Sequence, residues 1–160
     1  MTETNINTSS DLDVLDTDSG SAVSQEIQDL AAGKAAFMST IPGDDFETKV
    51  KTVEAMTNSV AVKQNLGKTI NLAHVIVQSI PMLDKRTGEV RDQPRIVLLD
   101  ADGTAYHAIS GGLFTSVKNI LGVMGNPVTW PAPLPIHIIG VQGKSGGDYF
   151  TAKIGPAPKK

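Results

Sequence analysis

Two short segments contain residue types suited to ligand binding, but neither has the spacing that its chemistry requires. Gly143-Lys144-Ser145 matches the end of a phosphate-binding P-loop, which needs a further glycine at the position occupied by Ile138. Asp100 to Gly103 matches the start of a calcium loop, but the later ligands and the terminal glutamate are missing. We therefore interpret the first segment as a glycine-rich turn and the second as a tight reverse turn.

The histidines also form no predicted site. His74, His107 and His137 lie on three separate predicted strands, no two of them have metal-ligand spacing, and the chain has no cysteine. His107 has no serine or cysteine partner that the sequence identifies, so a catalytic dyad or triad is not supported. The sequence therefore predicts a protein that is not an enzyme and that has no metal ion or cofactor.

Cations and aromatic rings are arranged as a single-strand nucleic-acid binder requires, with positive charge for the phosphates and flat surfaces for the bases. The complete candidate set is Lys68, His74, Lys85, Arg86, Arg91, Arg95, Tyr106, Lys144, Tyr149 and Lys153. Alternation places Tyr106 on the face of its strand opposite Ile109, and it places Tyr149 outward on the last strand. Because aromatic residues make up only 4% of the chain, the alternative is that both tyrosines merely lie at the rim of the fold.

The elements that would position these residues follow a definite order. Strands are predicted at 69–80, 95–99, 104–109, 136–142 and 148–154, with a helix at 111–124 between the third and the fourth. In the first strand Ile70, Leu72, Ile76 and Ile80 share one face, and His74 on that face indicates a bulge or bend. The order strand-strand-strand-helix-strand-strand predicts a five-stranded OB-fold barrel, mainly β with helices, although other small α+β folds share it.

The N-terminal part of the 160-residue chain is predicted to lie outside this barrel. Residues 1–33 carry seven acidic residues and no lysine or arginine, whereas the rest of the chain has a net charge of +4. The predicted segments are an acidic, largely disordered tail with at most a weak helix near its end (1–43), a helical extension with a helix at about 45–58 (44–65), the barrel (66–155) and a short basic tail (156–160). An acidic tail on a basic domain favours a nucleic-acid partner, or it serves solubility alone.

Three runs of sequence resemble segments of a known family. LDADGTAYHAIS at 99–110, GNPVTW at 125–130 and VQGKSGGDYFTAKI at 141–154 are similar to segments of single-stranded DNA-binding proteins of bacteriophages with Gram-positive hosts and of related mobile elements. The family includes the type found in phages that replicate by protein priming, and the similarity covers roughly 66–154. It implies an OB-fold with Tyr106 next to DNA. The chain departs from the family's smaller members at Ser79, Ile80, Met82 and Leu83, where those members carry tyrosines.

The sequence therefore predicts a sequence-tolerant protein that coats and protects single-stranded DNA during phage DNA replication or recombination. The predicted partners are single-stranded DNA, replication proteins that contact the acidic tail, and further copies of the chain. Two alternatives stay open: an adaptor or structural oligomer that uses the barrel and the helix at 45–58 for protein contacts, and an OB protein that binds RNA. No membrane span or signal peptide is present, so the predicted location is the cytoplasm, that of the host for a phage-encoded chain.

Overall fold

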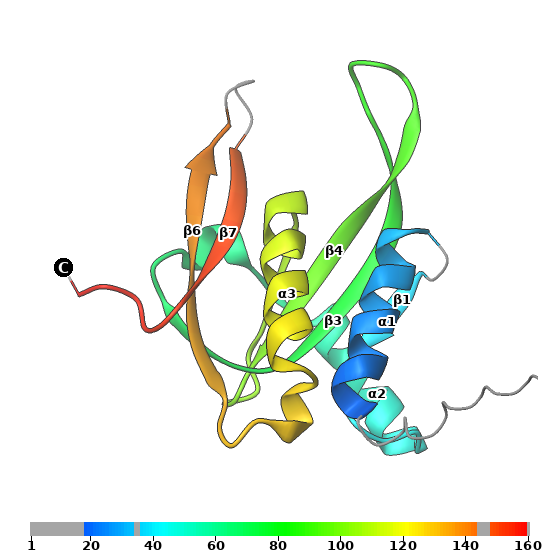
Figure 1. Ribbon diagram of the computed structural model, residues 1–160. Helices are drawn as coiled ribbons and strands as arrows, with labels where there is room; N and C mark the ends of the chain where they lie inside the picture. The colour runs from blue at the N-terminus through cyan, green and yellow to red at the C-terminus, as the bar shows by residue number, and fades with distance from the viewer. Residues whose placement is uncertain (1–17, 34–35, 144–147, 160) are drawn as a thin grey trace, which may run out of the picture.

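The strands of the protein form one curled sheet, seen in a computed structural model that describes residues 18–33, 36–143 and 148–159 (Figure 1). The elements are α1 (Asp18–Ala31), β1 (Phe37–Ser39), α2 (Phe46–Thr57), β2 (Val60–Ala61), η3 (Val62–Asn65), β3 (Thr69–Leu83), β4 (Val90–Asp100), β5 (Ala105–Ile109), α3 (Gly111–Met124), η4 (Pro127–Thr129), β6 (Leu134–Gln142) and β7 (Asp148–Ile154). The series β3, β4, β5, α3, β6, β7 confirms the predicted OB-fold order in a mainly β protein with helices.

The long strand β3 joins the two halves of the sheet, whose order is β2-β5-β4-β3-β6-β7, with β1 also paired to β3. A register shift between Leu72 and His74 in the β3–β4 ladder confirms the predicted bulge. Because side chains alternate along a strand, the extra residue moves Val75 to the core face that Leu72 occupies. The prediction that Ile76 shares that face is therefore wrong, and Ile76 lies on the opposite face.

Helices cover both faces of the sheet. On one face α1 and α3 pack side by side over the main core (Figure 1). This face buries Ile27 and Leu30 of α1 and Leu113, Val117 and Leu121 of α3. On the other face α2 packs Ala55 and Met56 against a second cluster formed by Ile76, Val97 and Ala105. No helix in the described parts of the chain is long and apolar enough to cross a membrane.

Two serines, the N-cap of α3 and one in its second turn, stabilise the free edge of β7. Ser110 caps the helix, since its hydroxyl accepts a hydrogen bond from the Leu113 N–H at 3.1 Å. The same hydroxyl accepts from the Phe150 N–H at 3.3 Å, and the Ser116 hydroxyl accepts from the Ala152 N–H at 3.1 Å. Within the described residues no strand ladder joins β5 to β7, so the barrel is half open and α3 fills this side.

The N-terminal segments differ from the prediction. Residues 18–31 form α1 and residues 37–39 form β1, whose Met38 is buried in the main core. The prediction of a largely disordered tail with at most a weak helix near its end therefore underestimates the order of these residues, because α3 and β3 provide apolar partners that sequence alone does not reveal. Residues 1–17 of the predicted tail lie outside the described residues. The predicted helix at about 45–58 is confirmed as α2.

The hairpin between β3 and β4 is longer than predicted. Leu83 pairs with Val90, so the two strands continue into the segment that separates the predicted strands 69–80 and 95–99. The turn is tight because the Asp84 N–H donates to the Glu89 carbonyl at 2.7 Å and Gly88 adopts a φ of +76°. The result is a two-stranded arm, residues 79–94, that projects from the body of the protein (Figure 1).

Candidate nucleic-acid interface

The arm carries three of the candidate cations. Lys85 and Arg86 lie in its turn, and Arg91 lies on β4 opposite Met82. Acidic residues alternate with them, so the segment from 84 to 92 has three cations and three carboxylates and no net charge. The arm therefore attracts a polyanion only at short range, through individual side chains rather than through a long-range field.

The ion pairs within the arm leave its arginines accessible. Arg86 Nε lies 3.9 Å from an Asp84 oxygen, and Arg91 Nη2 lies 3.7 Å from a Glu89 oxygen. Both arginines are largely exposed, and exposed pairs of this kind contribute little free energy. A hydrogen bond from the Arg86 N–H holds the pKa of Asp84 below its usual value, so this carboxylate stays charged. A DNA phosphate can therefore replace these carboxylates as the partner of the two arginines with little loss of free energy.

Tyr149 lies near the opposite loop of the fold. The paired ends of β6 and β7 project on the same side as the arm, with the start of α3 between them (Figure 1). The Tyr149 ring packs closely against Gly112, since a Cβ at that glycine would lie 2.5 Å from Tyr149 Cδ2. The residue remains 43% exposed, as its predicted outward position requires. Lys153 is exposed on β7 opposite His137, and Lys144 lies outside the described residues.

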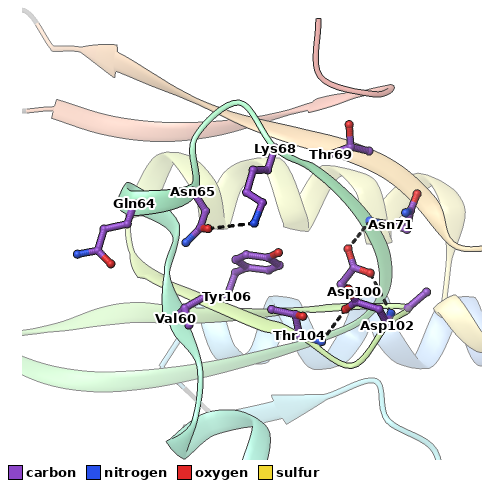
Figure 2. Close-up of a pocket in the computed structure, with 11 residues that line it drawn as sticks. Val60, Gln64, Asn65, Lys68, Thr69, Asn71, Asp100, Asp102, Thr104 and Tyr106 are labelled. Atoms are coloured by element: carbon purple, nitrogen blue, oxygen red, sulfur yellow. Dashed lines mark hydrogen bonds between the residues drawn. The ribbon is translucent and has the colours of Figure 1, made fainter. Parts of the chain in front are cut away.

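Lys68 and Tyr106 come together in a polar cavity of about 880 Å³ at the other end of the sheet (Figure 2). Figure 2 shows Tyr106 between two groups of side chains that line the cavity: Gln64, Asn65 and Lys68 on one side, and Asn71, Asp100, Asp102 and Thr104 on the other. Lys68 is exposed, and its ammonium donates to the Asn65 amide oxygen at 3.5 Å. The cavity thus combines one cation, an aromatic residue and several amide groups.

The two carboxylates of the cavity are held by the turn between β4 and β5. Asp100 accepts hydrogen bonds from the Asn71 and Asp102 N–H groups, each at 2.9 Å. Asp102 accepts from the Thr104 N–H at 2.8 Å, and this bond holds the pKa of Asp102 below its usual value. Burial raises the pKa of Tyr106, and the nearby carboxylates raise it further, so its phenol stays a hydrogen-bond donor.

Tyr106 differs from the exposed stacking residue that its alternation suggests. It is only 5% exposed and belongs to the main core with Ala108. The alternation itself is correct, because Ile109 lies on the opposite face and is exposed. The face that carries Tyr106, however, is the one that packs under α1 and α3, so the ring lines the cavity but offers it little free surface.

Arg95 and His74 lie apart from both the arm turn and the cavity. They are on the α2 side of the sheet, where each contacts the segment that leads into or out of α2. The Arg95 guanidinium donates to the Met56 carbonyl at 3.0 Å and to Gln78 Oε1 at 3.2 Å. The His74 ring lies 3.3 Å from the Thr40 hydroxyl, and burial lowers its pKa. In this conformation both residues serve internal contacts.

Two features of the interface were missed by sequence reasoning. Phe37 on β1 pairs with Gln78 and is 47% exposed, which gives this edge of the sheet an accessible aromatic ring. No sequence signal identifies it, because β1 has only three residues and lies within the segment predicted as tail. The amide side chains of Gln64, Asn65 and Asn71 also have no recognisable motif, since the cavity assembles them from η3 and β3.

The comparisons with known proteins assign the chain to a family. The sequence model described as phage single-stranded DNA-binding protein, of the phi29 phage type, matches residues 31–155 and so includes β1 and α2. No curated protein and no solved structure matches the chain. The family match agrees with the OB-fold order of the strands and with the resemblance found in 66–154. The chain belongs to the phi29-type phage single-stranded DNA-binding protein family, and it binds single-stranded DNA in phage replication.

Proposed function

We propose that the protein binds single-stranded DNA with little sequence preference and without catalysing a reaction on it, and that the Lys68–Tyr106 cavity receives one unpaired nucleotide. The observation that carries this proposal is the convergence of Lys68, the Tyr106 phenol and amide side chains around one open volume of about 880 Å³. Lys68 matches a phosphate, and the phenol and amides match the polar edges of a base.

The composition of the cavity favours tolerance of sequence. Asn and Gln side chains both donate and accept hydrogen bonds, so they can pair with any of the four bases. Lys68 contacts only the backbone of the strand, which carries no sequence information. Asp100 and Asp102 repel phosphate, so the nucleotide enters with its phosphate toward Lys68 and its base toward Tyr106.

The absence of catalysis is supported by how the carboxylates are used. Asp100 and Asp102 accept backbone hydrogen bonds within their own turn, and Asp102 has a lowered pKa. A general acid or base needs a pKa near the working pH, so the lowered pKa of Asp102 makes it unsuited to proton transfer. Their role is to fix the turn that carries β5 and Tyr106.

Further partners belong to the same proposal. Residues 1–17 contain four of the acidic residues and supply a ligand for a basic replication protein. Copies of the chain that coat one strand meet each other, and the exposed Phe46 and Val53 on α2 favour such contacts. The protein works in the cytoplasm of the host, where phage DNA replicates. Gel filtration with and without oligo(dT) tests self-association.

The central test is binding of labelled oligo(dT) by the full chain. We expect oligo(dT) to bind, duplex DNA and RNA to compete weakly, and Lys68→Ala to reduce the salt dependence by roughly 0.7 in log K per log salt, the value of one phosphate contact. The matched control is Lys159→Ala, which removes an exposed lysine near the C-terminus. Equal competition by duplex DNA, or an unchanged salt slope for Lys68→Ala, would contradict the proposal.

A further inference from the structure

The sheet face opposite the main core, which we name the outer face, carries groups that bind anions. Along β4, Arg95 pairs with Gln78 of β3, and Val97 in the next row pairs with His107 of β5. In OB-folds, oligonucleotides bind the face formed by the second and third strands, which are β4 and β5 here. A guanidinium and an imidazole on that face are suited to the phosphates of a nucleic acid.

Residues 40–59, which we name the cover segment, occupy this face. Ser59 is the main contact, since its hydroxyl lies 2.8 Å from His107 Nδ1 and accepts from Arg95 Nη2 at 3.3 Å. Arg95 also donates to the Met56 carbonyl at 3.0 Å. At its other end, the Thr40 hydroxyl contacts His74 and accepts from the Val75 N–H at 2.9 Å. The cover segment therefore takes the hydrogen-bonding capacity that a phosphate would use.

The charge of the cover segment is complementary to the outer face. It has four acidic residues and two lysines, a net charge of −2. Its acids are Asp44, Asp45, Glu47 and Glu54. An acidic segment beside the Arg95 guanidinium has the sign of charge that a nucleic acid would bring to the same place.

Ile41 at the start of the cover segment packs against the second cluster, but the helix α2 is weakly anchored by apolar contacts. In α2 the side chains of Phe46 and Val53 are 82% and 60% exposed, and the buried residue is a threonine, Thr52. Only the partly buried Ala55 and Met56 reach the second cluster from this helix. A helix that turns its large apolar side chains to solvent gains little from burial, so its detachment costs less than that of an ordinary core helix.

The open part of the outer face leads directly to the covered part. Arg91 lies on the same face of β4 as Arg95, four residues away and about 13 Å along an extended strand. Beside this path are the exposed Met82, opposite Arg91, and the exposed ring of Phe37, opposite Gln78. A nucleic acid strand held by the arm therefore reaches the edge of the cover segment.

We propose that the outer face is a second single-strand-binding surface, which the cover segment occupies in the DNA-free protein and which a longer DNA strand takes over by displacing α2. In the displaced state the phosphates contact Arg95 and His107, and the bases lie on Ile76 and Val97. This inference rests on the proposed function, because it requires that the protein binds single strands. It predicts that the apparent affinity of the outer face for DNA equals its intrinsic affinity multiplied by the fraction of molecules in which the face is uncovered.

The test is hydrogen exchange of the full chain with and without saturating oligo(dT), read separately for residues 46–57 and for the cavity region 64–71. We expect oligo(dT) to speed exchange in 46–57 while slowing it in 64–71. Slower or unchanged exchange in 46–57, with protection in 64–71, would overturn the displacement of α2 and leave the proposed function intact. No protection anywhere and no binding would overturn the proposed function itself and this inference with it.

A substitution tests the same inference from the other side. Ser59→Ala removes the hydroxyl shared by Arg95 and His107, and the loss of about one hydrogen bond raises the uncovered fraction about fivefold. We expect tighter binding of long oligo(dT) by up to that factor. The matched control, Thr129→Ala, removes an exposed hydroxyl bonded to the Asn126 carbonyl and should bind as the wild type does. If Ser59→Ala binds no more tightly than this control, the cover segment does not compete with DNA.

Discussion

The most direct test of how this protein presents its tyrosines is to replace Tyr106 and Tyr149 by leucine in parallel. Tyr106 is 5% exposed in the main core, whereas Tyr149 is 43% exposed against Gly112. We expect the first substitution to reduce mainly the free energy of unfolding and the second to reduce mainly the free energy of DNA binding. The alternation of its strand alone gives the opposite expectation for Tyr106, namely a loss of DNA binding with little loss of stability.

The magnitudes follow from burial. Leucine at position 106 is smaller than tyrosine by roughly 25 Å³, and a cavity of that size costs about 0.6 kcal/mol at about 24 cal/mol per Å³. The branched leucine also fits the site of a flat ring poorly, which adds about 1 kcal/mol, so the total loss of stability is about 1.5 kcal/mol. At position 149 the loss of a half-exposed ring costs little stability, but removal of one stacking surface costs about 1–3 kcal/mol of binding.

Urea unfolding followed by circular dichroism measures stability, and anisotropy of labelled oligo(dT) measures binding. Tyr106→Phe provides the matched control, since it keeps the packed ring and removes only the hydroxyl that faces the cavity. We expect this variant to retain stability and to lose about 0.5–1.5 kcal/mol of binding, the value of one hydrogen bond. If Tyr106→Leu unfolds at the wild-type urea concentration and Tyr149→Leu binds normally, the assignment of the two rings is refuted.

Three further predictions use other contacts. Gly112→Ala should cost about 1–3 kcal/mol of stability, because its Cβ would lie 2.6 Å from the Phe150 carbonyl oxygen, whereas Gly111→Ala meets nothing within 4 Å and should be neutral or stabilising by urea unfolding. Burial and the Arg95 guanidinium lower the pKa of His107 below its usual value of 6.5, so the unfolded chain binds the proton more readily than the folded one. The free energy of unfolding should therefore fall as the pH drops below 6.5. His107→Gln should weaken this pH dependence in a plot of the urea midpoint against pH. Deletion of residues 1–17, which keeps α1, should tighten oligo(dT) binding at low salt if this acidic segment competes with DNA, and an unchanged affinity would leave it only a role in solubility.

The order of strands was predictable because its signals are local. Each strand of the barrel has its own apolar alternation, and glycine, aspartate or proline residues separate it from the next. The bulge in β3 was also visible, since His74 interrupts the apolar face of the strand. Its consequence was not visible: a one-residue shift exchanges the two faces, and only the ladder with β4 shows that Val75 then joins the core.

The same methods predicted α1 only as an optional weak helix near the end of the tail. Between residues 24 and 33 it offers only Ile27 and Leu30 as large apolar residues, which is too few for a convincing helical stripe. Both are nevertheless buried, because they pack on α3, which lies more than 80 residues later in the chain. Its stability depends on a tertiary partner, as is usual for short helices in proteins.

The candidate site shows a related limit. Alternation separates the two faces of β5, but it does not say which face is the core when helices cover both. Tyr106 and Ala105 lie on opposite faces of the strand, and both are buried. A sheet covered on both sides has little free surface for a ligand. DNA therefore uses the arm, the edge near Phe37, the exposed Tyr149 ring and the cavity at Tyr106, or it displaces a cover. The weak apolar anchoring of α2, compared with the deeply buried side chains of α3, indicates that α2 is the cover that gives way.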